Sequence, residues 1–353
     1  MTLFDFDKNF DAFLVVTQKN RRYFTRFDST FGYLILTKDR KIFLTDSRYF
    51  EMAQESNSQG VEFELDIVGR YDLKDKLNEI FSSLKVKNIA FEDNELTFAE
   101  VKDLKETLKN FNLVEGGNAL TELKKYKNDY EVECIEKAQK ITDKVFSEVL
   151  ATVKEGMTEK ELSVQMQCLM LKYGAEKNSF DPIVSFGENT SKPHAHPTDR
   201  KLKKGDNVLL DFGCVVGGYC SDMTRTFFFG EPDEKIKKVY EIVKEAQIEV
   251  LNNLKCGMTC REAYEIAQKV FEKYNVQQNF THALGHGVGI DIHETPSLHP
   301  LNNDVLRESM IVTVEPGLYF PKLGGVRIED MVLICGDCIK NLTKSPKDII
   351  IIK

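Results

Sequence analysis

The sequence lacks the features that direct a protein to a membrane or to nucleic acid. No apolar run in its 353 residues approaches the roughly 20 residues that cross a bilayer. Positive charge is not in excess, because 48 Lys and Arg stand against 56 Asp and Glu for a net charge of -8. Nucleic acid and anionic membrane surfaces are therefore not expected as partners, and a small or neutral substrate fits this charge better.

The first ten residues, MTLFDFDKNF, lack both the positive segment and the apolar core of an export signal. We therefore expect a cytoplasmic protein whose eight cysteines are free thiols. Cys335 and Cys338 have CxxC spacing, but there is no second CxxC for a tetrahedral zinc site, and Gly-Asp between them predicts a turn. Cys214 and Cys220 flank a predicted hairpin turn, and neither pair is assigned a function.

The length and the 42% hydrophobic content allow two domains. Strand and helix patterns predict a mixed α/β domain over residues 1–122, followed by a second domain over residues 123–353. The segment VEGGNALTE, residues 114–122, is the predicted linker. The first-domain patterns are two strands in residues 33–46, one near residue 90, and helices at 73–84 and 101–108.

An internal repeat organises the second domain. After a predicted amphipathic helix over residues 132–153, EVLATVKEGMTEKEL at 148–162 and EVLNNLKCGMTCREA at 249–263 share eight of fifteen residues at an offset of 101. Each copy is predicted to end one helix at a glycine and to begin the next with a capping box. The glycines are Gly156 and Gly257, and the capping boxes are Thr158 to Glu161 and Thr259 to Glu262. Two similar helix boundaries without a true repeat remain the alternative.

A hairpin with two acidic residues follows the first copy of the repeat. The pair Gly217-Gly218 predicts a two-residue turn, which places Asp211 opposite Thr224 and makes Asp222 its diagonal neighbour on one sheet face. Two carboxylates on a half-buried face repel each other and lose hydration. A positive group should therefore lie between them.

The second half carries a similar pair of acidic residues. Glu315 and Glu329 interrupt the apolar runs SMIVTVEPGLYF and GGVRIEDMVLI, about one hundred residues after the first hairpin. Both halves thus follow the order helix, helix, acidic hairpin, and a two-fold-like pairing would bring four carboxylates together to hold metal. Two divalent cations would balance about four negative charges.

Oxygen-rich ligation with one imidazole suits manganese, cobalt or zinc in a catalytic site, and Mn(II) is the first expectation. Such a pair lowers the pKa of a bridging water and polarises a carbonyl or phosphoryl oxygen. The imidazole is expected from His286, which stands between Gly285 and Gly287. We expect a loop or strand there, in which the glycines let the backbone approach a ligand.

All six histidines lie between residues 194 and 299, within the domain that carries the acidic hairpins. His194 and His196 lie in a proline-flanked loop, and one of them is expected to face the site as a hydrogen-bond donor. The spacing of His282 and His286 imitates two ligands on a helix, but the surrounding glycines argue against a helix. His299 has no feature that favours function.

Five short motifs occur in order: DFG at 211–213, SDMTRT at 221–226, GHGVG at 285–289, EPG at 315–317 and RIED at 327–330. Taken together, these motifs resemble the M24 metallopeptidases of the "pita-bread" fold, which include aminopeptidase P, prolidase and methionine aminopeptidase. The resemblance covers residues 123–353, and the first domain is similar to the N-terminal domain of the Xaa-Pro branch, with RFDST as a departure from its pattern. It implies an α+β fold: a pita-bread domain with two helix-helix-hairpin halves behind a smaller creatinase-like α/β domain.

By resemblance, Asp211 ligates one metal and Asp222 and Glu329 are shared by both. His286 and Glu315 complete the second metal's ligands, and Glu315 also takes the proton from the nucleophilic water. All five ligand types are intact.

The remaining roles also come from the resemblance. His194 matches the family's substrate-binding or proton-transferring histidine. His282 and His293 line the pocket for the residue before the scissile bond and for the leaving proline. His293 is also expected to be a catalytic residue. Arg327 is placed next to the substrate as a partner that orients carboxylates.

The resemblance implies a dimeric, dinuclear exopeptidase that cleaves the bond between a first residue and a following proline. The large N-terminal domain disfavours methionine aminopeptidase. Aminopeptidase P is favoured over prolidase. A metal-free peptide-binding module or a creatinase-like hydrolase of the same fold is the further alternative.

Overall fold

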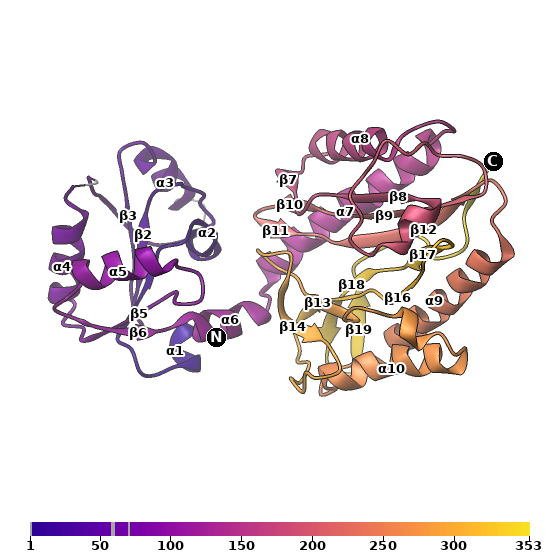
Figure 1. Cartoon of the computed structure of the whole chain (residues 1–353). Coiled ribbons are helices and arrows are strands. Elements are labelled where there is room, and N and C mark those ends of the chain that lie inside the picture. The colour runs from indigo at the N-terminus through magenta and orange to yellow at the C-terminus, as the bar shows by residue number, and fades with distance from the viewer. Residues whose placement is uncertain (1, 58–60, 70) are drawn as a thin grey trace. The chain divides into compact units, whose positions relative to one another are not determined.

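The computed structural model describes residues 2–57, 61–69 and 71–353. The chain divides into two compact units, Met1–Lys124 and Lys125–Lys353, so the boundary lies two residues later than expected (Figure 1). Within the described residues, no helix is long and apolar enough to cross a membrane.

The first unit is a six-stranded sheet in the order β4-β3-β2-β1-β5-β6, in which β1 pairs parallel with β5 and antiparallel with β2. Side chains alternate along β1, so that Phe13 and Val15 enter one apolar cluster while Ala12 and Leu14 enter another on the opposite face. Helices α1, α3 and α6 contribute to the first cluster, and α4 and α5 to the second. This confirms the mixed α/β domain. The strands are β1 (Ala12–Val15), β2 (Tyr33–Leu36), β3 (Lys41–Thr45), β4 (Glu64–Ile67), β5 (Asn88–Phe91) and β6 (Asn112–Glu115), and the helices are α1 (Leu3–Phe6), α2 (Gln18–Thr25), α3 (Phe50–Asn57), α4 (Leu73–Ser83), α5 (Phe98–Thr107) and α6 (Gly117–Lys125).

The linker prediction for residues 114–122 was wrong, because this segment forms the end of β6 and most of α6. Leu120 is buried in the first unit's core and Gly116 packs against it, where a Cβ would collide with Phe13 and Ala90. The glycine pair therefore marks close packing at a strand-to-helix turn and not a flexible connection.

The second unit contains two sheets that carry the acidic hairpins, in the orders β20-β12-β9-β8 and β14-β13-β15-β18-β19, together with the small sheets β11-β10-β7 and β16-β17. Helices α7 and α8 precede the first of these sheets in the chain, and α9 and α10 precede the second. The helices are α7 (Asp129–Thr152), α8 (Glu159–Lys172), α9 (Glu234–Asn253) and α10 (Cys260–Lys273), with short 3-10 turns η1 (Gly187–Ser191) and η2 (Gln277–Asn279). The strands are β7 (Lys177–Asn178), β8 (Ile183–Phe186), β9 (Asp206–Phe212), β10 (Cys214–Val216), β11 (Tyr219–Cys220), β12 (Met223–Phe229), β13 (Gly285–Gly287), β14 (Glu294–Leu298), β15 (Ile311–Val314), β16 (Gly317–Phe320), β17 (Gly324–Arg327), β18 (Asp330–Cys335), β19 (Cys338–Asn341) and β20 (Ile351–Ile352).

The repeat is structural as well as sequential. Both predicted capping boxes form, at the start of α8 and of α10. The backbone around them also matches, because Thr158 bridges Lys201 in one half and Thr259 bridges Val305 in the other. The order helix, helix, acidic hairpin is thus repeated in three dimensions.

The helices before the two capping boxes end earlier than predicted. They stop at Thr152 and Asn253, and not at Gly156 and Gly257. Val153 and its counterpart Leu254 take an extended backbone and bury their side chains, which ends the helical hydrogen bonding. The glycines instead supply the positive φ of the following turn, at 85° and 88°.

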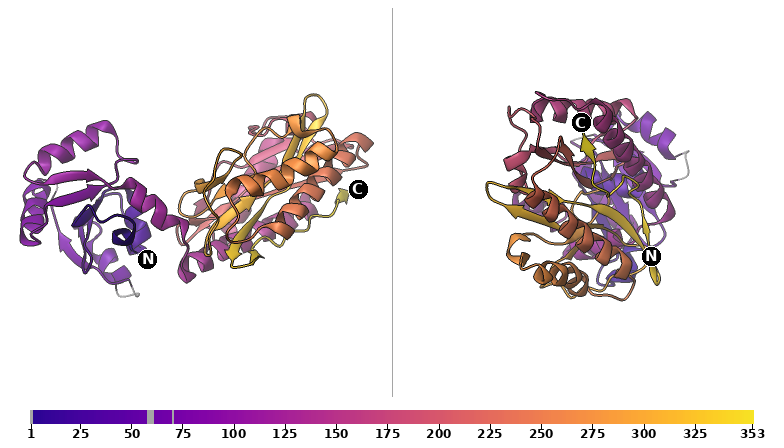
Figure 2. Two further views of the ribbon diagram at one scale, coloured as in Figure 1. Left: turned by 90° about the horizontal axis from the view of Figure 1, so that it is seen from below. Right: turned by 90° about the vertical axis from the view of Figure 1, so that its right-hand side faces the viewer.

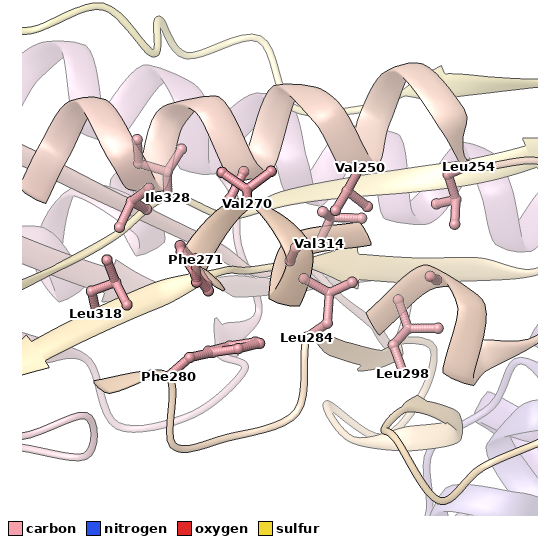
Figure 3. Packing of buried hydrophobic residues seen from close by; sticks show 14 of the residues in the cluster. Val250, Leu254, Val270, Phe271, Phe280, Leu284, Leu298, Val314, Leu318 and Ile328 are labelled. Atoms are coloured by element: carbon pink, nitrogen blue, oxygen red, sulfur yellow. The ribbon is translucent and has the colours of Figure 1, made fainter. Parts of the chain in front are cut away.

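Each half has its own apolar core. In the second half, Val250 of α9, Leu254 just after it, and Val270 and Phe271 of α10 pack against strand residues such as Val314 (Figure 3). Figure 2 shows these two helices lying across the strands of their half. The first half repeats this with α7 and α8 against β8, β9 and β12. These cores hold the acidic hairpins rigidly.

The predicted hairpin register is confirmed. Asp211 pairs with Thr224 across β9 and β12, and Gly217 and Gly218 both take positive φ in the turn between β10 and β11. The turn between Cys335 and Cys338 is also confirmed, because these residues pair directly at the end of the β18–β19 hairpin. The eight cysteines are free thiols.

Arg225 fastens the two halves together. Its guanidinium is buried, pairs with the buried Asp330 at 2.7 Å, and donates at 2.6 Å to the carbonyl of Glu329. Two further carbonyls, of Pro346 and Ser345, accept from it at 3.1 and 2.8 Å. β12 of the first half is thereby tied to the start of β18 in the second.

We expect Arg225→Met to lower the free energy of unfolding of the second unit by roughly 3–5 kcal/mol, because it leaves Asp330 buried without its main counter-charge. Urea denaturation measures this. Lys137→Met, which breaks the exposed pair with Glu133, is the matched control and should leave the free energy of unfolding nearly unchanged. Equal losses in the two variants would contradict the role of Arg225.

Candidate metal centre

Four carboxylates and one imidazole come from both halves to one cavity. Asp211 lies in β9 and Asp222 just before β12, whereas Glu315 follows β15 and Glu329 precedes β18. His286 lies at the centre of β13, the strand or loop predicted there. All five line a cavity of about 690 Å³ in the second unit.

Four of the five side chains lie close together, and the charge of the fifth, Asp211, acts on the other carboxylates. Ligand atoms of Asp222, His286 and Glu329 all lie within 4.8 Å of each other. His286 Nε2 is 3.5 Å from Asp222 Oδ2 and 3.4 Å from Glu315 Oε1. Asp211 faces the same group, and its charge acts on Asp222, Glu315 and Glu329.

The electrostatics of the cluster call for a cation. Burial, followed by the neighbouring carboxylates, raises the pKa of Asp222 and of Glu329 well above the usual range. Burial likewise raises the pKa of Glu315 to about 8. Buried oxygens of Asp211 and Asp222, both Oδ1, have no hydrogen-bond partner among the described residues. Such a cluster retains its four charges only with positive charge among them.

His286 has the protonation state of a metal ligand. Burial and the nearby His293 lower the pKa of His286 to about 4, so its ring is neutral at pH 7. Nδ1 lies 3.0 Å from the carbonyl of Gly287, which makes Nδ1 the donor and leaves the lone pair on Nε2. That lone pair points toward two carboxylates, an arrangement that fits a shared divalent cation.

The glycines beside His286 do something other than predicted. A Cβ on Gly285 would collide with the backbone of Thr313, and one on Gly287 with the backbone of Thr295. The glycines therefore let neighbouring strands approach β13, whereas the sequence suggested an approach of the backbone to a ligand. Close strand packing fixes the position of His286.

Two threonines that the sequence analysis overlooked orient the carboxylates. Thr224 Oγ1 donates to Glu329 at 2.6 Å, and Thr313 Oγ1 donates to Glu315 at 3.2 Å. Thr313 also accepts the backbone N–H of His286 at 3.0 Å. Thr224 lies two residues after Asp222, and Thr313 lies two residues before Glu315. Residues two apart in a strand point to the same face, so this spacing is the sequence signal that would have identified both threonines.

Arg327 is buried and is occupied by protein groups. Its guanidinium donates to Asp211 at 2.5 Å, to Tyr319 Oη at 2.7 Å, to Thr224 Oγ1 at 3.0 Å and to the carbonyl of Pro193 at 3.3 Å. Burial alone would lower the pKa of Arg327, but Tyr319 and the carboxylates raise it. Its cationic head is therefore held against Asp211 and the loop backbone.

Tyr319 extends this chain of hydrogen bonds to His282. Burial raises the pKa of Tyr319 to about 12, and its hydroxyl lies 3.0 Å from His282 Nε2. His282 Nδ1 lies 2.7 Å from the carbonyl of Ala283, so both ring nitrogens already have protein partners. Burial lowers the pKa of His282 to about 4. Tyr319, absent from the sequence-based set, is the residue that connects Arg327 with His282.

Of the remaining histidines, three line the cavity and one does not. His194, His196 and His293 line the cavity, and the ring of His293 stands 4.3 Å from that of His286. The structure does not decide which of His194 and His196 faces the site, because both line the cavity and both are exposed on the same loop. His299 is not among the lining residues, and its Nδ1 accepts the backbone N–H of Leu301 at 3.2 Å.

The chain matches two family models, Metallopeptidase family M24 over residues 133–335 and the Creatinase/Prolidase N-terminal domain over residues 7–124. It is 35% identical to the Xaa-Pro dipeptidase of Pyrococcus horikoshii over 98% of this chain and 96% of that protein. Among solved structures, it is similar to an Xaa-Pro dipeptidase from Bacillus anthracis (TM-score 0.93, 36% identity, 99% and 98% of the chains) and to an X-Pro aminopeptidase from Thermotoga maritima (TM-score 0.92, 31%, 97% and 98%). The buried acidic cluster and these matches lead to one conclusion: this chain belongs to metallopeptidase family M24.

Proposed function

We propose that this protein is a dinuclear, metal-dependent Xaa-Pro aminopeptidase. The observation that supports this most directly is a group of four carboxylates, three of them buried and Glu315 half-buried, with one neutral imidazole on the wall of a cavity of about 690 Å³. Relatives named as Xaa-Pro peptidases support the substrate class. A peptide-binding module without metal would have to bury the same four carboxylates uncompensated, which disfavours that alternative.

The metal ligands in this proposal are Asp211, Asp222, His286, Glu315 and Glu329, with Asp222 and Glu329 shared. When bound, two divalent cations, Mn(II) in the first place and Co(II) or Zn(II) otherwise, supply Lewis-acid polarisation of the scissile carbonyl and a lowered pKa for the attacking water.

The chain's own groups perform the proton transfers. In our proposal the Glu315 carboxylate, oriented by Thr313, accepts the proton of the attacking water and returns it to the leaving proline nitrogen. His194 donates a hydrogen bond to the reacting peptide from the loop across the cavity. His293 lies beside the scissile bond.

Proline specificity follows from the lining of the cavity. Phe180, Ile183, Ile292 and Pro193 provide apolar wall, and His282 and His293 lie beside it. A peptide bond to proline has no N–H, so the leaving residue can rest against apolar groups without an unpaired donor. Arg327 acts in this scheme by orienting Asp211.

The choice of aminopeptidase over dipeptidase rests on charge. A dipeptide places a free carboxylate directly on the proline, which requires a cationic partner. Of the described residues that line the cavity, Arg327 is the one Lys or Arg, and its guanidinium already makes four hydrogen bonds to protein groups. Longer peptides, which carry no charge at that point, are therefore favoured.

The second candidate is an Xaa-Pro dipeptidase. The names of the Pyrococcus horikoshii and Bacillus anthracis proteins favour it. A homodimer and a cytoplasmic location stay predictions from the sequence.

Substrate length and the residue after the scissile bond test this proposal. With manganese loaded, we expect cleavage of Xaa-Pro-Yaa peptides to exceed that of Xaa-Pro dipeptides. Replacing proline by alanine should lower kcat/KM strongly, because an unpaired buried donor costs about 1–3 kcal/mol. Comparing kcat/KM on the three peptide types measures both effects. Efficient cleavage of dipeptides with little cleavage of tripeptides would assign the protein as a dipeptidase. Equal rates on Xaa-Pro-Yaa and Xaa-Ala-Yaa would refute the proposed proline specificity.

Asp222→Asn should reduce bound metal as well as activity. A neutral amide at a shared position removes one charge and one bridging oxygen from the cluster. Elemental analysis of the purified variant measures the metal content. Asp337→Asn, at the exposed tip of the β18–β19 turn, is the matched control. Two metals per chain with unchanged turnover in Asp222→Asn would remove this residue from the ligand set.

His194→Ala should retain its metal while kcat falls roughly 10²-fold, the usual size of a lost proton transfer or transition-state hydrogen bond. Parallel kinetics and elemental analysis separate the two effects. His299→Ala, outside the lining of the cavity, is the control. If the loss occurs in His196→Ala instead, the role belongs to the other histidine of the loop.

A further inference from the structure

The segment that carries His194 and His196 connects β8 to β9 and has little regular structure after its first turn. We call residues 187–198 the histidine loop. Thr190 fixes its first turn, since Thr190 Oγ1 accepts the backbone N–H of Gly325 at 2.8 Å. The carbonyl of Pro193 accepts a hydrogen bond from Arg327 at 3.3 Å. The rest of the loop needs another anchor.

Glu159, the first residue of α8, supplies that anchor. One carboxylate oxygen accepts the backbone N–H of Phe186 at 2.8 Å and the side-chain amide of Asn189 at 3.0 Å. The other accepts the backbone N–H of Thr198 at 2.8 Å and its hydroxyl at 2.5 Å. A single side chain therefore holds the chain immediately before the histidine loop, its first turn and its last residue.

Because Glu159 is buried, its carboxylate depends on these hydrogen bonds. Its side chain is fully buried, and a buried carboxylate is tolerated only when its oxygens are hydrogen-bonded. Every partner named above is a donor, and two of them are backbone N–H groups. Glutamine cannot replace this carboxylate, because its amide nitrogen would face one of these N–H groups.

The other half of the molecule shows that α8 does not need this carboxylate to begin. The repeat offset of 101 places Cys260 at the equivalent position, the first residue of α10. The backbone N–H of Cys260 donates to the carbonyl of Asp304 at 2.9 Å. In the same way, the backbone N–H of Glu159 donates to the carbonyl of Arg200 at 3.2 Å. The same helix start and the same backbone contact thus form with a cysteine at this position.

We propose that Glu159 is a positioning residue for catalysis, which holds the histidine loop so that His194 faces the cavity. This inference rests on the role of His194 in the proposed function. Glu159 acts through the loop and contacts no reacting atom.

Amide hydrogen exchange and kinetics on the full-length, metal-loaded protein test it. In Glu159→Gln, exchange should rise across residues 187–198 while the rest of α8 stays protected. kcat should fall roughly 10- to 100-fold, the size expected when a catalytic group is misplaced by about 1 Å. Glu161→Gln is the matched control, because it removes a carboxylate from the same helical turn, where Glu161 caps Thr158 and does not touch the loop.

A double-mutant cycle with His194→Ala separates positioning from general damage. In the His194→Ala background, adding Glu159→Gln should change kcat by less than about 2-fold, because the positioned group is already gone. An equal fall in both backgrounds, or unchanged exchange in the loop, would overturn the proposal. If Glu159→Gln does not fold, Thr198→Val removes one of the same hydrogen bonds and should show a smaller effect with the same pattern.

The exchange measurement does not depend on turnover. A wild-type protein that cleaves no Xaa-Pro peptide would refute the proposed function, while the exchange arm would still report whether Glu159 holds the loop.

Discussion

The second unit is organised around a cluster of like charges that cannot remain ionised by itself. Asp211, Asp222, Glu315 and Glu329 share one buried site, and burial together with mutual repulsion raises the pKa of three of them. A fold can keep such a group only if it brings positive charge to it or holds it rigidly enough for cations to do so. The surrounding structure does both.

The two-fold arrangement brings the cluster together. Each half contributes one acidic hairpin backed by its own helix pair and its own apolar core, so no single half has to bury four carboxylates. The halves meet where β12 faces the start of β18, and the buried Arg225 fastens that junction.

Neighbouring polar side chains orient the ligands. Thr313 binds Glu315 two residues along the chain, whereas Thr224 of the first half binds Glu329 of the second half. Arg327 holds Asp211 while its other hydrogen bonds run to Tyr319 and the histidine loop. The same guanidinium therefore connects the acidic cluster to the loop of His194. Glu159 holds the last residue of that loop, Thr198.

The sequence alone determined the features that depend on local chemistry. Gly217-Gly218 specified the register of Asp211 against Thr224, the capping boxes specified where α8 and α10 begin, and the repeat specified the two halves. It misjudged Gly116 and Gly285, because a glycine looks the same in a linker, beside a ligand or between two close strands. Tyr319 and Glu159 were beyond its reach, since Tyr319 contacts His282 and Glu159 contacts Phe186 and Thr198, all in segments distant along the chain. Only the tertiary structure decided those contacts, because hydrogen bonds between distant segments leave no periodic signal in the sequence.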